Sequence, residues 1–216
     1  MKKFAIITDF DGTITTRDIG HALCTHFGTM KRGGEVKDYD TKEDPTLWFN
    51  KFFSPIKVSK EEFESIILSY AVVKKGFDSL VLFAQENKIP FEIVSGGLDI
   101  YIKPILKKHQ LPPVPLYCVR GILSPKGIEV SFPDYPQIAL DDFKAQRVKY
   151  YKNKGYTTVF LGDGLVDLEA AKQADILFAT DYLAELCKKN NIPYREFKDF
   201  TKLLKMLKEN YVPLSA

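Results

Sequence analysis

The chain has 216 residues, of which 45% are hydrophobic and 27% are charged. This length suits one sizeable α/β domain, or a core domain carrying a smaller one, with the composition of an ordinary globular protein. The formal net charge of +3 is too small to indicate binding to nucleic acid or a membrane surface, and no stretch approaches the roughly 20 apolar residues of a membrane span.

The cysteines and the N-terminus indicate a cytoplasmic protein. Cys24, Cys118 and Cys187 are far apart in the sequence and have no metal-binding spacing. We therefore expect buried thiols in a reducing compartment. The apolar run at the N-terminus is too short for a secretory signal.

The first 75 residues predict a strand followed by a mostly helical insertion. Residues 4–8 form an apolar run that is typical of a buried strand. The insertion covers residues 17–75 and contains a helix over 18–27, a polar loop over 28–44, an aromatic cluster at Trp48, Phe49, Phe52 and Phe53, and a helix that follows a capping box at residues 59–62.

Strands and helices alternate after residue 76. We expect strands over 90–94, 157–161, 176–179 and 194–197, helices over 77–86, 98–109, 143–154, 166–174, 182–190 and 200–208, and two or three short strands within 116–132. This alternation predicts a parallel sheet with right-handed crossovers.

Three polar, glycine-bearing segments follow predicted strands, at residues 9–13, 95–97 and 162–167. The carboxyl ends of parallel strands meet at one edge of a sheet, where open α/β sheets bind their ligands. We therefore expect the three segments to form one site.

Asp9 and Asp11 are the most informative pair of residues in this predicted site. Like charges in a confined site repel each other and raise one pKa, so that a cation or a proton-transfer role usually compensates. The pair favours Asp9 as a nucleophile and Asp11 as a general acid and base, with a divalent metal beside them. The alternative interpretation is an Asp-Gly turn, followed by Thr13 as a helix cap.

The second and third segments contain groups that suit a phosphate and a metal. Ser95 and Gly96 offer a hydroxyl and backbone N–H groups ahead of a helix, which suits a phosphate or an ordinary helix cap. Asp163 suits Mg²⁺, a hard cation that prefers oxygen ligands. Asp167 could hold a metal-bound water, orient a lysine or simply complement the helix dipole.

A lysine near the start of a predicted helix completes the set. Cations are disfavoured at helix N-termini, so Lys144 is either solvated or held there by a phosphate or by carboxylates. Arg147 and Lys149 are competing candidates.

Together these residues predict a phosphoryl-transfer mechanism. Asp9 attacks phosphorus, and Mg²⁺ is held by Asp9, Asp163 and the backbone carbonyl of Asp11. Ser95, Lys144 and backbone N–H groups stabilise the phosphoryl oxygens. Asp11 protonates the leaving alcohol and then deprotonates the water that breaks the aspartyl-phosphate.

These motifs, in this order, resemble those of the haloacid dehalogenase superfamily of phosphohydrolases. The resemblance covers essentially the whole chain and rests on residues 9–13, Ser95, Lys144 and residues 162–167. It implies a Mg²⁺-dependent phosphomonoester hydrolase that acts on a small phosphorylated metabolite. In this resemblance Thr13, Ser95, Gly96 and Lys144 bind phosphate, and Asp167 supports the site.

The same resemblance implies how the chain is divided. Residues 1–16 and 76–216 would form a Rossmann-like catalytic core with a parallel sheet. Residues 17–75 would form a small helical cap inserted after the first strand, and a short β-hairpin insertion would lie around 116–133.

Within the superfamily, residues 89–99, 167–172 and 178–183 resemble the phosphoserine-phosphatase-like branch. More narrowly, they resemble the methionine-salvage phosphatases that act on 2-hydroxy-3-keto-5-methylthiopentenyl-1-phosphate. Residues 141–144 replace a cysteine-rich stretch of those salvage enzymes. The Phe-x-x-Arg cap pattern of phosphoserine phosphatases is missing, although Asp18 lies near the position of their glutamate and Arg32 lies well inside the expected cap.

Two other classes of protein use similar residues. A phosphoacceptor signalling domain also combines Asp, Lys, Ser or Thr and Mg²⁺, but such a module is expected to be about half this length. Asp11 argues against it, because a carboxylate at that position speeds hydrolysis of the phosphoenzyme. A phosphotransferase or phosphomutase keeps the same first motif, and it would move phosphate to a second acceptor instead of water.

Overall fold

A central sheet organises the computed structural model, which describes residues 3–31, 45–134 and 139–210. The sheet order is β4-β3-β2-β1-β5-β6-β7. The strands are β1 (Phe4–Thr8), β2 (Phe91–Leu98), β3 (Leu116–Ser124), β4 (Gly127–Ser131), β5 (Thr157–Gly162), β6 (Ile176–Ala179) and β7 (Arg195–Glu196). All neighbouring strands are parallel except β3 and β4, which form an antiparallel hairpin.

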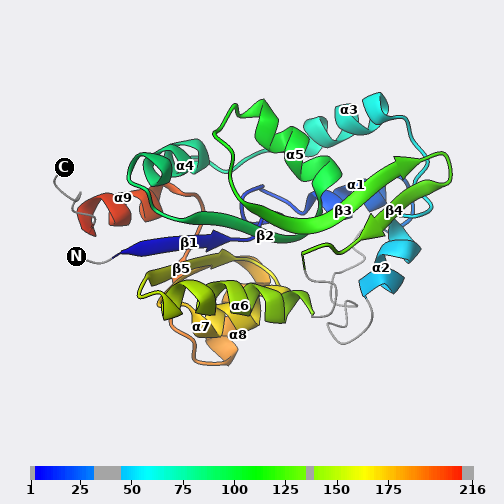
Figure 1. The fold of residues 1–216 in the computed structure, drawn as a ribbon. Coiled ribbons are helices and arrows are strands. Elements are labelled where there is room, and N and C mark those ends of the chain that lie inside the picture. The colour runs from blue at the N-terminus through cyan, green and yellow to red at the C-terminus, as the bar shows by residue number, and fades with distance from the viewer. Residues whose placement is uncertain (1–2, 32–44, 135–138, 211–216) are drawn as a thin grey trace.

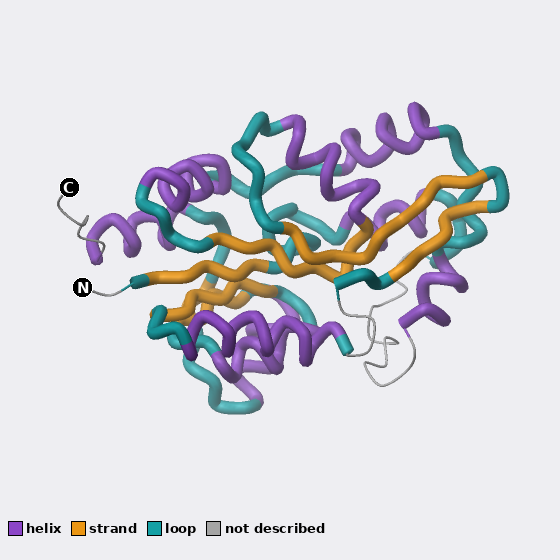
Figure 2. Tube along the Cα trace, viewed as in Figure 1, coloured by secondary structure: helices purple, strands orange, loops and turns teal. Residues whose placement is uncertain are grey.

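Helices cover both faces of the sheet (Figures 1 and 2). They are α1 (Ile19–His26), α2 (Pro45–Phe52), α3 (Lys60–Tyr70), α4 (Phe77–Glu86), α5 (Asp99–Lys108), α6 (Leu140–Asn153), α7 (Leu168–Gln173), α8 (Asp181–Lys189) and α9 (Thr201–Asn210). Helices α4 and α5 lie on one face, with α9 packed beside α4, and α6, α7 and α8 lie on the other (Figure 1). The five residues of β1 are therefore fully buried between two layers, as expected for a central parallel strand.

Helices α1, α2 and α3 are inserted between β1 and α4, and the two ends of this insertion lie side by side. Thr15 and Val73 form an antiparallel bridge. On either side of it, Thr16 N donates to Val72 O at 2.8 Å and Lys74 N donates to Ile14 O at 2.8 Å. The inserted helices match the predicted helical insertion, and its status as a separate cap domain over 17–75 stays a prediction.

The β3–β4 hairpin supports the inserted helices. Helix α2 packs on β4, and the Ser54 hydroxyl donates to the Ile128 carbonyl at 3.2 Å. Gly127 is required at the hairpin turn because its φ is +130° and a Cβ there would lie 1.7 Å from the Ser54 carbonyl oxygen. The hairpin predicted around 116–133 therefore reaches the insertion.

The structure differs from the predicted elements at three places. Strand β2 continues through residues 95–97, which were expected to form a turn, because pairing with β3 resumes at Leu98 and Val119 after a register shift. Helix α6 begins at Leu140, ahead of the predicted 143. The aromatic cluster is part of a helix, α2. Most of the predicted loop over 28–44 lies outside the described residues.

The structure also agrees with the expectation that the cysteine thiols are buried. Cys24, Cys118 and Cys187 are buried and not disulfide-bonded. None of the helices in the described part of the chain has the length and hydrophobicity needed to cross a bilayer.

Candidate active site

The carboxyl ends of β1, β2 and β5 bring the predicted residues to one cavity. It has a volume of about 610 Å³, and its lining includes Asp9, Asp11, Ser95, Asp163 and Asp167. The backbone N–H of Asp9 donates to Leu161 O at 3.0 Å, which ties the start of the first motif to β5. The structure therefore brings the three strand ends together at one cavity.

Lys144 lies behind the cavity wall and is held by two carboxylates. Its Nζ lies 2.8 Å from Asp9 Oδ1 and 2.6 Å from Asp167 Oδ1, and its side chain is fully buried. Burial alone would lower the pKa of Lys144, but Asp167 and Asp9 together raise it above its ordinary value. Lys144 therefore stays a cation, which explains how a lysine is accommodated near a helix start.

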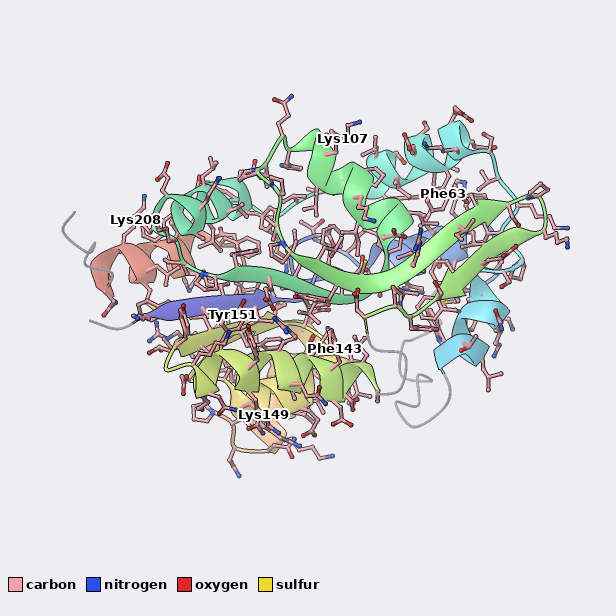
Figure 3. The ribbon with its side chains drawn as sticks, in the orientation of Figure 1. Phe63, Lys107, Phe143, Lys149, Tyr151 and Lys208 are labelled. Carbon is pink, nitrogen blue, oxygen red and sulfur yellow. The ribbon has the colours of Figure 1, made fainter. Side chains whose placement is uncertain are left out.

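The competing cations on α6 do not contact these carboxylates. Arg147 donates from Nε and Nη2 to the two carboxylate oxygens of Glu92, at 2.9 and 2.6 Å. Lys149 is exposed on the side of α6 that faces away from the sheet, whereas Tyr151 on the same helix donates to Glu92 (Figure 3). Lys144 is therefore the α6 cation of this site.

Asp167 has a supporting position. Its Oδ1 accepts from Lys144, while its Oδ2 accepts from the backbone N–H groups of Asp163 and Gly164, each at 3.0 Å. Residues Leu165–Asp167 form a short 3₁₀ turn that places the side chain back over this loop. Asp167 therefore contacts both the lysine and the loop that carries Asp163, and its role stays a prediction.

Asp163 packs closely against the first motif. Its Oδ1 accepts from the Thr13 hydroxyl at 2.7 Å. Gly12 has a φ of +72°, and a Cβ there would lie 2.2 Å from Asp163 Oδ2, so both the conformation and the space require glycine. Burial, together with the charges of Asp9 and Asp167, raises the pKa of Asp163 well above its ordinary value.

Asp9 is buried with only 6% of its surface exposed. Burial raises the pKa of Asp9 to about 6, even though Lys144 acts in the opposite direction. The carboxylates of Asp9, Asp163 and Asp167 each place an oxygen within 4.8 Å of the others, a spacing that could hold a metal ion. A cation among these three groups would offset the cost of burying their charges.

Asp11 is held by two donors that approach from different elements. The Tyr101 hydroxyl of α5 donates to Oδ2 at 2.5 Å, and the Ile19 N–H of α1 donates to Oδ1 at 2.9 Å. Burial, and then the charge of Asp18, raise the pKa of Asp11 well above its ordinary value. Such a carboxyl group retains its proton at a higher pH than an exposed aspartate, which is what a general acid requires.

The segment at 95–97 fits tightly around these groups. Ser95 is buried, and its Oγ accepts from Gly97 N at 3.0 Å. A Cβ on Gly96 would lie 2.8 Å from Leu140, and one on Gly97 would lie 2.5 Å from Asp11 Oδ2. The glycines therefore allow α6 and Asp11 to approach the strand.

The opposite side of the cavity comes from the insertion between β1 and α4. Met30, Trp48, Phe49 and Phe53 line it. Phe49 and Phe53 are also almost fully buried, with ring centroids 5.4 Å apart. Phe49 and Phe53 therefore line the cavity and also pack in the interior of the protein.

Several residues near the site were not assigned by the sequence. Tyr101 and Lys74 are within hydrogen-bonding distance of the first motif, but no local pattern points to either. His21 also lines the cavity, and among the described residues its Nε2 has no hydrogen-bond partner. His26 instead pairs with the Tyr70 hydroxyl at 2.8 Å. Arg32 lies outside the described residues.

Comparison with known proteins places the chain among hydrolases. A family model described as haloacid dehalogenase-like hydrolase matches residues 6–172. A 2-hydroxy-3-keto-5-methylthiopentenyl-1-phosphate phosphatase of Exiguobacterium sibiricum is 32% identical, with 90% of this chain and 92% of that protein covered. A phosphatase of the same name from Lysinibacillus sphaericus is 30% identical, with 94% and 93% covered.

The fold is also found among solved structures. A substrate-bound phosphoserine phosphatase superposes with a TM-score of 0.70 at 19% identity, covering 95% of this chain and 98% of that one. A phospho-aspartyl intermediate analogue of phosphoserine phosphatase gives a TM-score of 0.69 at the same identity, covering 95% and 99%. At this level of identity the likeness supports the fold alone.

Proposed function

The chain belongs to the haloacid dehalogenase-like hydrolase family and acts as a phosphatase, and we propose that it hydrolyses a small phosphomonoester through an aspartyl-phosphate on Asp9. The observation that carries this proposal is the buried ion pair through which Lys144 orients Asp9. Asp11, two residues further along the chain, supplies a second carboxyl group, and the pKa of this group is raised. A nucleophile and a proton donor so close together suit phosphoryl transfer.

We assign the attack to Asp9. Lys144 engages Oδ1 at 2.8 Å and so fixes the orientation of the carboxylate, which leaves Oδ2 as the attacking oxygen. Because the phosphoryl group carries most of its charge on its non-bridging oxygens, catalysis depends mainly on positioning and electrostatics. Bond formation between Oδ2 and phosphorus releases the alcohol and leaves the phosphoryl group on Asp9.

Asp11 supplies the proton and later removes one. With its raised pKa it donates a proton to the departing alcohol oxygen. The resulting carboxylate then takes a proton from the water that attacks the aspartyl-phosphate, which releases phosphate and restores both groups. Tyr101 and the Ile19 N–H hold Asp11 in position for this exchange.

The donor set suits Mg²⁺, which we propose as the cofactor. Asp9 and Asp163 offer carboxylate oxygens, and the Asp11 backbone carbonyl would complete the protein ligands, as hard oxygen donors for a hard cation. Both Asp167 oxygens already accept hydrogen bonds, so we keep Asp167 as a supporting residue. When bound, Mg²⁺ would offset charge between the nucleophile and the phosphoryl group.

For the phosphoryl oxygens we propose contacts with Ser95, the Gly96 N–H and Lys144. Ser95 and Gly96 line the cavity, and the ammonium of Lys144 lies directly behind Asp9. Thr13 was predicted to join them. Its hydroxyl donates to Asp163 here, so binding phosphate would require that hydroxyl to change its partner.

The cavity favours an uncharged, partly apolar tail on the substrate. Trp48, Phe49 and Phe53 form an apolar wall, and the described lining contains carboxylates but neither Lys nor Arg. A second anionic group, such as the carboxylate of phosphoserine, would face repulsion there. We therefore propose 2-hydroxy-3-keto-5-methylthiopentenyl-1-phosphate, which the named relatives act on and which has an apolar methylthio end.

Release of phosphate from matched substrates tests this proposal. We expect Mg²⁺-dependent hydrolysis of p-nitrophenyl phosphate, faster turnover of the methylthio compound, and much slower turnover of phosphoserine. Chelation with EDTA should stop all three reactions, and added Mg²⁺ should restore them. Transfer of phosphate to a second alcohol without net release would contradict hydrolysis. Preference for phosphoserine would contradict the substrate assignment alone.

We also propose a cytoplasmic location, because the protein has three buried cysteines that form no disulfide.

A further inference from the structure

Lys74 lies where the chain returns from the inserted helices towards α4, and it contacts both the first motif and Ile14, the residue that follows this motif. Its backbone N–H donates to Ile14 O at 2.8 Å. Its Nζ donates to Gly12 O at 2.5 Å. A residue far along the chain is thereby fixed against the loop that contains Asp9 and Asp11.

The ammonium of Lys74 is placed among groups that favour a cation. It lies 5.0 Å from the centroid of the buried Phe197 ring, in a cation–π arrangement. Partial burial lowers the pKa of Lys74, whereas Asp163, Asp181 and Asp9 act in the opposite direction. These three carboxylates are therefore close enough to interact with its charge.

Lys74 and Lys144 approach the carboxylates in different ways. Lys144 binds Asp9 and Asp167 directly through two hydrogen-bonded ion pairs. Lys74 instead bonds to the backbone carbonyl of Gly12, the residue that packs against Asp163. The cavity lining itself has neither Lys nor Arg among the described residues, so the positive charge near the site comes from lysines behind that lining.

We propose that Lys74 is a positioning residue of the phosphatase site, a second and partly buried cation that fixes the Gly12 carbonyl and offsets the carboxylates so that they can accept a phosphoryl dianion. This inference rests on the proposed function in one respect, namely that the substrate is a phosphomonoester. Lys74 forms no bond with the reacting atoms and transfers no proton. It acts through the backbone of the loop and through its charge.

The charge role predicts opposite effects on an anion and a cation. In Lys74→Met, binding of inorganic phosphate should weaken by about 10-fold, because one positive charge near the site is lost. Binding of Mg²⁺ should become roughly threefold tighter, because a competing cation is gone. Turnover of p-nitrophenyl phosphate should fall by about 10-fold or more through the loss of loop position.

Two matched variants separate charge from packing. Lys74→Arg keeps the cation and should restore most of the phosphate affinity. Lys75→Met removes the neighbouring lysine, whose side chain is exposed, and should leave both affinities and turnover unchanged. Isothermal titration calorimetry of the full chain with MgCl₂ alone, and with phosphate in the presence of Mg²⁺, measures the two affinities independently of turnover.

The inference is supported if Lys74→Met binds phosphate more weakly and binds Mg²⁺ with unchanged or higher affinity, and if Lys74→Arg recovers the phosphate affinity. It is overturned if Lys74→Met matches Lys75→Met, if both ligands weaken equally, or if Arg fails to rescue. Because the binding measurements need no turnover, they decide on Lys74 even if the wild-type chain hydrolyses none of the tested esters.

Discussion

The two sides of the active-site cavity are built from different kinds of contact. On the strand side, charged groups are fixed at hydrogen-bonding distance, as in the 2.8 and 2.6 Å contacts of Lys144 with Asp9 and Asp167. On the side of the inserted helices, aromatic rings pack with centroids more than 5 Å apart, as between Trp48 and Phe49 at 5.2 Å. Charge-assisted bonds are strict in geometry, whereas apolar packing tolerates changes of shape.

This difference indicates that the two sides of the cavity have different roles in the reaction and in substrate choice. Under the proposed function, we expect the strand side to determine the reaction, because moving an ionised group by a small distance changes its interactions greatly. We expect the side of the inserted helices to determine which substrate tail fits beside the phosphate. Substitutions on the two sides should therefore differ in both the size and the kind of their effect.

The largest effect is expected for Asp9, the proposed nucleophile. We expect Asp9→Asn to lower phosphate release from p-nitrophenyl phosphate by at least about 1,000-fold, because an amide cannot form the phosphoenzyme. The fold should persist, since the amide keeps the shape of the side chain. Circular dichroism and thermal unfolding would check the fold. Substantial turnover in a folded variant would remove Asp9 from the nucleophilic role.

The next effect concerns stability. Lys144→Met leaves Asp9 and Asp167 buried without their cation, so the free energy of unfolding should fall by about 3–5 kcal/mol at pH 7. Urea unfolding followed by fluorescence would measure the loss. Lys149→Met, on the exposed side of the same helix, is the control and should stay within about 0.5 kcal/mol of the wild-type protein. Equal losses of unfolding free energy in both variants would show that the ion-pair network contributes nothing to stability.

A smaller effect is expected for the residue that holds the general acid. Tyr101→Phe removes the hydroxyl that donates to Asp11 at 2.5 Å and keeps the ring packing. We expect kcat to fall by about 10-fold, corresponding to the loss of one hydrogen bond, with little change in KM. Steady-state kinetics with p-nitrophenyl phosphate would test this. A change confined to KM would place Tyr101 in substrate binding instead.

The smallest effect belongs to the apolar side. Trp48→Ala should raise KM for the methylthio substrate by about fivefold to tenfold through lost apolar contact area, with kcat almost unchanged. Glycerol phosphate, which has no apolar tail, is the matched substrate and should show little change in KM. Equal losses for both substrates would mean that Trp48 supports the site as a whole, which would blur the distinction between the two sides.

The sequence predicted the residues whose signals are local. Asp9 and Asp11 are two positions apart, and Asp163 lies in a glycine-flanked turn after a strand, so the spacing itself carries the information. The α/β fold followed from the alternation of strands and helices, and the family comparison confirms it. The roles of the individual site residues stay predictions.

What the sequence missed depends on long-range contacts. Tyr101 meets Asp11 across 90 residues and Lys74 meets Gly12 across 62, and no periodicity encodes such pairs. The segment at 95–97 has the composition of a turn, yet pairing with β3 extends the strand to Leu98. Tertiary pairing overrides local propensity there.

The bridge between Thr15 and Val73 has a consequence for how such a chain can change over time. Thr16 N lies 2.8 Å from Val72 O, so everything between these residues leaves the core and returns to it at a single point, between β1 and α4. A segment with adjacent ends can be lengthened, shortened or exchanged while β1 and α4 keep their places. The position after the first strand is thus a place where inserted segments can be exchanged, so that one catalytic core can acquire new substrates.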